Sequence, residues 1–114
     1  AAFSAYEKEM IPSVTVSADK NPVYSTDPGN ATQDQVFLLS ITEANKYNLG
    51  SCRPTAYAYG NSYSGNCRWW LRSPGCYQSD AAVVDSNGYV FANGDSVYFR
   101  TKAVRPALWI DLNS

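Results

Sequence analysis

The chain has 114 residues, 45% of them hydrophobic, and a formal net charge of −1, which suits one domain with a core of its own. The near-neutral charge argues against a nucleic-acid-binding surface, and no apolar run reaches the roughly 20 residues that a membrane-spanning helix needs. Histidine is absent, so the commonest general base and the commonest metal ligand are both missing.

The first third of the chain predicts one short helix followed by an irregular loop. Ser4 and Glu7 have the spacing of a capping box, which predicts a helix that ends near Met10. Residues 12–34 place prolines and a glycine among polar residues. This composition indicates a surface loop, with a short extended piece at Val14–Val16.

The middle of the chain predicts one buried strand and a second short helix. Val36–Leu39 is a short apolar run, which is consistent with a buried strand. Ser40 and Glu43 form a second capping box and open a helix that Gly50 can end. Residues 54–59 predict one or two further helical turns, followed by a polar loop.

The last part of the chain is rich in strand signals. Residues 68–73 (RWWLRS) predict a strand that the following Pro-Gly ends. Residues 104–112 (VRPALWIDL) predict a final strand, in which Pro106 indicates an edge position or an irregular start. Short helices therefore come first and strands later, which indicates an α+β fold rather than a parallel sheet.

Residues 81–95 (AAVVDSNGYVFANGD) alternate between a uniform and a mixed set of side chains. The even positions are small or apolar, whereas the odd positions are of many kinds. Asp85–Gly88 predicts a type I turn followed by a left-handed glycine, within a three-residue hairpin loop. Such a loop preserves parity, so the odd positions of both strands share one face. We expect the even face on the core and the odd face in solvent.

Four segments of the chain resemble a known family: VFLLS at 36–40, PTAY at 54–57, WWLRSPG at 69–75 and VRPALW at 104–109. The family consists of bacterial domains with a C-type-lectin-like fold. It is similar to the variable proteins of diversity-generating retroelements and, more distantly, to the formylglycine-generating enzyme fold. The likeness covers nearly the whole chain, although relatives often carry a third aromatic residue in place of Arg68.

The resemblance implies a single C-type-lectin-like domain over residues 1–114, with short helices and a small, mostly antiparallel sheet. Residues 1–34 would be helix and irregular loop, and residues 76–103 the variable hairpin region. Relatives usually carry more sequence before the position of Ala1, which implies that the chain is either the C-terminal part of a larger domain or a processed or shortened product.

The resemblance also implies a function. In such proteins an error-prone reverse transcriptase copies a template repeat into the 3′ end of the gene, and substitutions arise at template adenines. The chain would be a non-enzymatic ligand-binding protein with a diversified surface, exported or at the surface of a bacterium, whose partner is an unknown protein or glycan. Tyrosine and phenylalanine supply contact area in such surfaces, and small polar residues supply adaptable hydrogen bonds. The expected ligand-binding face comprises Cys76, Tyr77, Ser79, Asp80, Val83, Asp85, Asn87, Tyr89, Phe91, Asn93, Asp95, Tyr98 and Phe99.

Two other functions stay open. A carbohydrate-binding module could stack sugars on Trp69, Trp70 and Trp109. Tryptophans are more often core residues, however, and we expect at least two of the three in the core. The aspartates of the hairpin could bind calcium, but the usual calcium-lectin triplets are missing. A structural or adhesion domain with a tolerant hairpin is the other alternative. We expect no catalytic residue, no cofactor, no metal site, no nucleic-acid partner and no membrane insertion.

The remaining polar candidates are cysteines and arginines. A zinc site usually takes four Cys or His ligands, and the chain has 3 cysteines and no histidine. A disulfide between Cys52 and Cys67 is the expected pairing if the protein is exported, while Cys76 falls in the variable region. Arg72 and Arg105 lie in apolar strands, where we expect them to pair with buried carbonyls or carboxylates.

Overall fold

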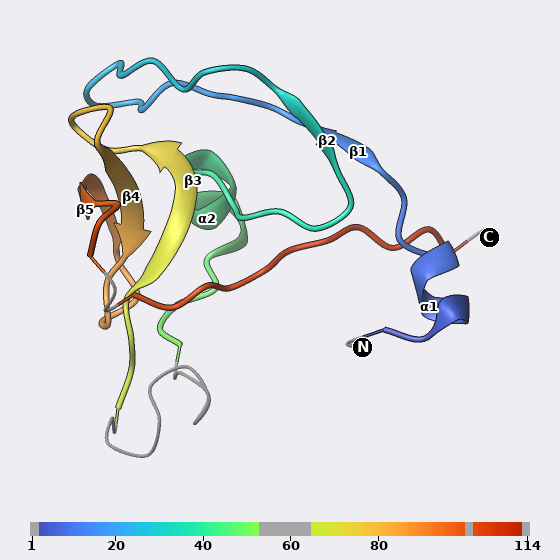
Figure 1. Ribbon diagram of the computed structural model, residues 1–114. Helices are drawn as coiled ribbons and strands as arrows, with labels where there is room; N and C mark the ends of the chain where they lie inside the picture. The colour runs from blue at the N-terminus through green and yellow to red at the C-terminus, as the bar shows by residue number, and fades with distance from the viewer. Residues whose placement is uncertain (1–2, 53–64, 100–101, 113–114) are drawn as a thin grey trace.

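The protein is an α+β domain with two short helices and two small antiparallel sheets, in a computed structural model that describes residues 3–52, 65–99 and 102–112 (Figure 1). One sheet has two strands in the order β1-β2, and the other has three strands in the order β3-β4-β5. The elements are α1 (Ala5–Glu9), β1 (Val14–Val16), β2 (Thr32–Asp34), α2 (Ile41–Tyr47), β3 (Trp69–Pro74), β4 (Asp80–Val84) and β5 (Val90–Ser96).

Both helices begin where the capping boxes predict. The side chains of Ser4 and Ser40 each accept a hydrogen bond from the backbone N–H three residues later, and a glutamate returns a bond to the cap. Helix α2 ends earlier than expected, because Asn48 rather than Gly50 adopts the first left-handed conformation, with φ 48°. Asparagine tolerates this region better than most residues. The helical turns predicted at 54–59 lie outside the described residues.

The two-stranded sheet lies apart from the three-stranded one. Val14–Val16 is extended, as predicted, and pairs with residues 32–34, which the sequence indicated as loop. Figure 1 shows this ribbon crossing from the upper end of the three-stranded sheet towards α1, where the C-terminal segment also ends. There the N–H of Asp111 donates to the carbonyl of Met10 at 2.8 Å.

Strands β4 and β5 form the predicted hairpin. The N–H of Asp85 donates to the carbonyl of Tyr89 at 2.8 Å, and the N–H of Gly88 donates to the carbonyl of Asp85 at 2.9 Å. Gly88 has φ 89°, as the left-handed position of a three-residue loop requires. Parity is preserved, because Val84 faces Val90 across the strands and Val83 faces Phe91.

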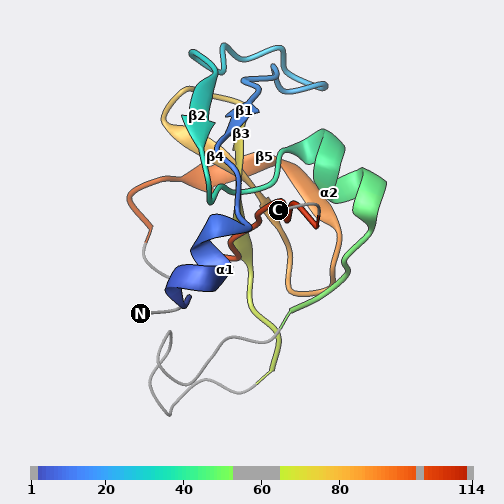
Figure 2. The same ribbon diagram turned by 90° about the vertical axis from the view of Figure 1, so that its right-hand side faces the viewer.

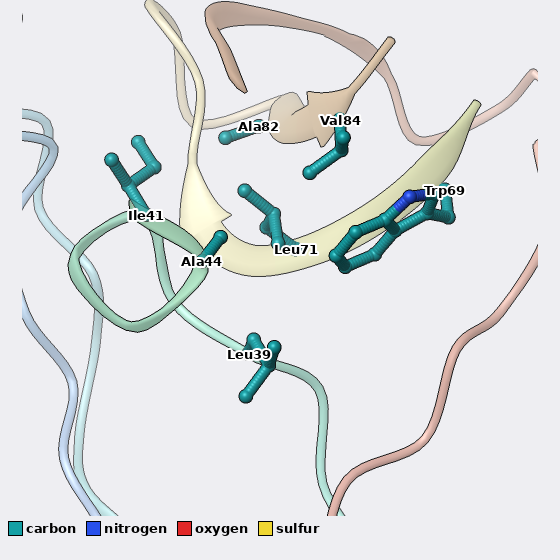
Figure 3. Close-up of a cluster of buried hydrophobic side chains, with 7 residues drawn as sticks. All are labelled: Leu39, Ile41, Ala44, Trp69, Leu71, Ala82 and Val84. Atoms are coloured by element: carbon teal, nitrogen blue, oxygen red, sulfur yellow. The ribbon is translucent and has the colours of Figure 1, made fainter. Parts of the chain in front are cut away.

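The even positions of the hairpin turn to the core, as predicted. Ala82 and Val84 of β4 join Trp69 and Leu71 of β3 against one side of α2 (Figure 3). Burial of such aliphatic and aromatic side chains is the main favourable contribution to folding. The buried cluster comprises Leu39, Ile41, Ala44, Trp69, Leu71, Ala82 and Val84.

The tryptophans divide between different environments. Trp69 is buried, whereas Trp70 is half-buried and Trp109 is 52% exposed. Only Trp69 belongs to the buried cluster, so the expectation of at least two core tryptophans was wrong. Neighbours along a strand point to opposite faces, so burial of Trp69 in the core turns Trp70 to the other side.

The predicted strands at 36–39 and 104–112 are reduced to one antiparallel bridge, in which Phe37 pairs with Ala107. Just before the second segment, Ala103 pairs with Trp69 of β3 in a parallel bridge. Pro106 has no N–H to donate, which interrupts a regular ladder beside Ala107. The segment passes the lower end of β3 and then crosses to α1 (Figure 1), which lies in front of the three-stranded sheet in the turned view (Figure 2).

Arg72 is bound as predicted, in a half-buried site between β3, α2 and the loop after β1. Its guanidinium donates to the carbonyls of Leu38 at 2.9 Å and Ser17 at 3.1 Å, and it forms an ion pair with Glu43. Arg105 differs from the prediction. Its guanidinium lies 5.0 Å from the ring centroid of Trp69 in a cation–π contact.

Glu43→Gln is expected to reduce stability above the usual glutamate pKa by about 1–2 kcal/mol, because the charge facing Arg72 is lost. Burial acts to raise the pKa of Glu43, but the N–H of Ser40 and the Arg72 guanidinium together outweigh it and lower the pKa. The stabilising charge is therefore present above a pH of about 4.3 and is lost as the pH falls through the lower pKa of the folded protein. Urea unfolding of both proteins should show curves that converge in acid; a gap independent of pH would contradict this.

Cys52 and Cys67 face each other in an isolated antiparallel bridge. The N–H of Cys67 donates to the carbonyl of Cys52 at 2.8 Å. Hydrogen-bonded antiparallel pairs have Cα atoms about 5.5 Å apart, which suits a disulfide. Burial, and then the neighbouring Cys52, raise the pKa of the Cys67 thiol.

We expect a Cys52–Cys67 disulfide to form with oxidised glutathione, slowly at neutral pH and faster in base, because the thiolate is the attacking form. The closed loop should raise stability by about 3 kcal/mol. Mass spectrometry of Cys76→Ser, which keeps the pair, should show the loss of two hydrogens. Recovery of glutathione adducts alone would contradict the pairing.

Candidate ligand-binding face

The side of the three-stranded sheet that turns away from the core carries most of the predicted ligand-binding residues. We call it the hairpin face. It comprises Arg68, Trp70, Val83, Asp85, Tyr89, Phe91, Asp95 and Lys102, with Tyr77, Asn87, Tyr98 and Phe99 in the adjoining loops.

Large aromatic side chains stand exposed on or beside this face. Tyr89 at the start of the returning strand is 74% exposed, and Tyr98 beyond the end of that strand is 82% exposed. Tyr77 and Phe99 are also exposed, and Phe91 is 38% exposed. Clusters of exposed aromatic side chains are uncommon on a surface that contacts only water. The hairpin pairing fixes the positions of Tyr89 and Phe91, and the other three rings stand on the adjoining loops.

Three predicted residues contribute less than expected. Val83 is fully buried, because it lies on the central strand between Trp70 and Phe91. Its assignment to the exposed surface was wrong. Asp80 has the parity of the core-facing residues and is half-buried, and its carboxylate accepts from the half-buried Cys76 thiol at 3.5 Å. The remaining predicted residues, Ser79, Asn87 and Asn93, are exposed.

Four charged side chains form an ion-pair network on the hairpin face. Arg68 Nε lies 2.8 Å from Asp85 Oδ1, and Arg68 Nη1 lies 3.4 Å from Asp95 Oδ2. Lys102 Nζ lies 2.9 Å from the same Asp95 oxygen. The two aspartates come from the hairpin, and the two cations come from outside it. The network therefore connects the hairpin to its flanking segments.

Lys102 is enclosed by aromatic rings. Its side chain is 4% exposed, and Nζ lies 4.9 Å from the Phe99 ring centroid and 5.5 Å from that of Trp70. A cation over aromatic rings gains energy when it is shielded from water. Lys102 therefore fixes two rings and one carboxylate of the face at once.

The long loop between β1 and β2 closes one edge of the hairpin. Asn21 is buried and donates from its amide to the carbonyls of Pro74 at 2.9 Å and Ala92 at 2.8 Å. Tyr24 follows on the surface, and its hydroxyl donates to the side chain of Asn93. The loop thereby adds an exposed tyrosine beside the hairpin face.

Sequence reasoning missed several residues of this site. The position of Trp70 on this face could have been predicted, because adjacent residues of a strand point to opposite faces and Trp69 points to the core. Arg68 and Lys102 carry no local signal, because their position depends on the bridge between Trp69 and Ala103. Tyr24 lies beside the site only because the loop between β1 and β2 packs against the hairpin, 69 positions away in the sequence.

A groove lies apart from the hairpin face, between α2 and the C-terminal segment. It is a mostly apolar groove of about 390 Å³. Its walls include the rings of Phe37, Tyr47 and Trp109, together with the Glu43 carboxylate. Within the described ranges, no group of three or more acidic, cysteine or histidine side chains is arranged to hold a metal ion.

Fold and site together define a small α+β domain that displays an aromatic, charge-balanced hairpin face. The chain belongs to a family of unknown function: its residues 1–112 match the family model described as "Domain of unknown function (DUF6273)". No curated protein and no solved structure matches the chain. In the described part of the chain, neither helix has the length and apolar character to span a membrane.

Proposed function

We propose that the protein is a non-enzymatic binding protein that presents the hairpin face to a partner, as the variable proteins of diversity-generating retroelements do. The observation that carries the proposal is the set of exposed aromatic rings on the hairpin and its adjoining loops, among small polar residues. Tyrosine, asparagine, serine and aspartate are the residues that adaptable contact surfaces favour. A C-type-lectin-like fold and export to the cell surface are part of the proposal and rest on the resemblance.

The mechanism is complementarity of shape and hydrogen bonding, with no chemical step. Tyr89, Phe91 and Tyr98 would supply the central contact area, and a polar rim of Asn87 and Asn93 would exclude water and orient the partner. The core side of the same hairpin holds the fold. Substitution of face residues can therefore change the partner without changing the scaffold.

Tyr89→Ala is expected to leave the free energy of unfolding within about 0.5 kcal/mol of wild type, because its side chain is 74% exposed. Trp69→Ala serves as the control and should cost about 3–5 kcal/mol, since that ring is buried. Chemical unfolding of both variants measures the difference. A loss of more than about 2 kcal/mol for Tyr89→Ala would make this ring a packing residue and remove it from the binding face.

The experiment that tests the proposed function is deep sequencing of the 3′ end of the gene across a source population. Substitutions should concentrate at the exposed positions between Cys76 and Phe99, at adenines of a nearby template repeat. They should spare Ala82, Val84 and Val90. Fixed residues at the exposed positions, with no template or reverse transcriptase nearby, would overturn the proposal.

A carbohydrate-binding module is the second candidate, and the groove at Trp109 favours it. Trp109 is 52% exposed and shares the groove with Phe37 and Tyr47, which offers rings on which a sugar could stack. A glycan array with wild type and Trp109→Ala, with and without chelator, tests this candidate. Binding that disappears in Trp109→Ala and survives in Tyr89→Ala would favour it over the hairpin face.

A further inference from the structure

The two cations of the hairpin face are fixed by the scaffold. The N–H of Trp70 donates to the carbonyl of Ala103 at 3.1 Å, and the N–H of Ala103 donates to the carbonyl of Arg68 at 2.8 Å. Trp69 and Ala103 both pack in or against the core. Because adjacent residues alternate between faces, Arg68 and Lys102 lie together on the hairpin face.

The two carboxylates belong to the hairpin itself. Asp85 follows the last residue of β4, and Asp95 lies near the end of β5. Their side chains are 27% and 22% exposed, so both are partly shielded from water. Ion pairs in such positions are screened less by salt than pairs on the open surface. The charges of the two aspartates balance those of Arg68 and Lys102.

The location of the four charges has a consequence for ligand choice. The cations come from segments that flank residues 76–99, and the carboxylates come from within that stretch. A ligand carboxylate, phosphate or sulfate that approached Arg68 or Lys102 would meet Asp85 and Asp95 as like charges. Like-charge juxtaposition at an interface is one of the main ways in which wrong partners are rejected.

Resting on the function proposed above, we propose that residues 85 and 95 determine the charge class of the ligand. With aspartate at both positions the face is neutral and accepts an uncharged partner surface through its aromatic rings. With uncharged residues there, the half-exposed Arg68 and the enclosed Lys102 lose their partners, and the unbalanced positive charge of the face attracts an anionic partner, which contacts Arg68. The scaffold thus carries a cation pair that the hairpin residues either neutralise or release.

Heparin, a sulfated polymer, is the probe that tests this proposal. Asp85→Asn/Asp95→Asn is expected to bind heparin about tenfold more tightly than wild type at low salt, since two paired cations are released. The gain should disappear in high salt. Asp19→Asn/Asp34→Asn is the matched control: it makes the same change in net charge at residues outside the network. The control should stay within about twofold of wild type.

Asp95→Asn leaves the enclosed Lys102 ammonium without its carboxylate partner, and circular dichroism would reveal whether the protein still folds. A second pair of variants tests the proposal if it does not. Arg68 is half-exposed, so Asp85→Asn alone is compatible with the fold. It should gain heparin affinity about threefold, and Arg68→Gln/Asp85→Asn should lose that gain. Equal gains in the network and control variants, or no gain in a folded network variant, would overturn the proposal.

Failure of this proposal is separable from failure of the proposed function. The heparin measurement needs no natural partner and reads only the charge state of the face. Sequencing of the gene reads only whether the exposed positions are diversified. A diversified gene with no heparin gain would leave the binding face in place and remove the charge rule alone.

Discussion

Gly94→Ala is expected to destabilise the protein by at least about 3 kcal/mol, which combines a strained backbone with a steric clash. Gly94 has φ 71°, in the left-handed region that residues with a Cβ rarely adopt. A Cβ built there would lie 2.1 Å from the carbonyl oxygen of Ala81 and 2.6 Å from its carbon. Both atoms belong to the backbone of β4, which cannot move away easily because it pairs with β3 on one side and β5 on the other.

The position of Gly94 explains why the structure cannot adapt. Val83 pairs with Phe91, but Ala81 pairs with Asp95, so the register of β4 and β5 shifts between these pairs. The shift is an irregularity of the bulge type, in which residues 92–94 of β5 lie opposite Ala82 alone, and Gly94 is one of them. Relief of the clash would require loss of the bulge, which would move the end of β5 and Asp95 with it. Thermal unfolding followed by circular dichroism measures the effect, and a fall in Tm of about 10 °C or more is expected.

Gly29→Ala is the matched control for this variant. Gly29 has φ 81°, yet nothing lies within 4 Å of a Cβ built on it. The control shares the backbone strain without the clash and should cost about 1 kcal/mol. Equal losses in the two variants would show that backbone conformation alone, and not the contact with Ala81, makes Gly94 necessary.

Asn21→Ala is expected to cost about 3 kcal/mol, because it leaves several buried backbone groups without a partner. The amide of Asn21 donates to two carbonyls of the sheet, and its oxygen accepts from the N–H groups of Val23 at 2.8 Å and Tyr24 at 3.1 Å. Asn21 is 1% exposed, so water cannot easily replace these bonds. Urea unfolding gives the loss directly.

Two comparisons sharpen the result for Asn21. Asn21→Asp should be at least as destabilising as alanine, since its carboxylate would face the carbonyls of Pro74 and Ala92. Asn45→Ala, at an exposed position of α2, should be neutral or slightly stabilising because alanine favours helices. If Asn21→Ala stayed within about 0.5 kcal/mol of wild type, the loop would not be held by this side chain.

The features that the sequence predicted well depend on contacts between near neighbours. Both capping boxes connect residues three positions apart, and the hairpin loop depends on Asp85 and Gly88. The alternation of residues 81–95 is kept in the structure because the even-numbered apolar residues pack in or against the core. These signals can be read from a few adjacent residues, and the predicted α+β class followed from their order.

The features that it missed depend on contacts between distant residues. Asn21 donates hydrogen bonds to the carbonyls of Pro74 and Ala92, which lie 53 and 71 positions further along the chain. Nothing in the sequence around Asn21 indicates that it is buried. Strand β2 is polar and exposed, and it is a strand only because β1 lies beside it. The pairing of Arg68 and Lys102 with the aspartates needs a bridge between segments more than 30 residues apart. Periodicity and spacing cannot report such contacts.

The length of the three-residue hairpin loop determines which side chains of β5 face the core and which face solvent. One inserted or deleted residue between Asp85 and Tyr89 would move every later side chain of β5 to the opposite side, and Val90 and Ala92 would exchange places with Phe91. The exposed residues of this hairpin can therefore vary, but its length must stay the same or change by an even number. Sister sequences should differ at the exposed positions of the loop, keep a glycine at the position of Gly88, and agree in spacing.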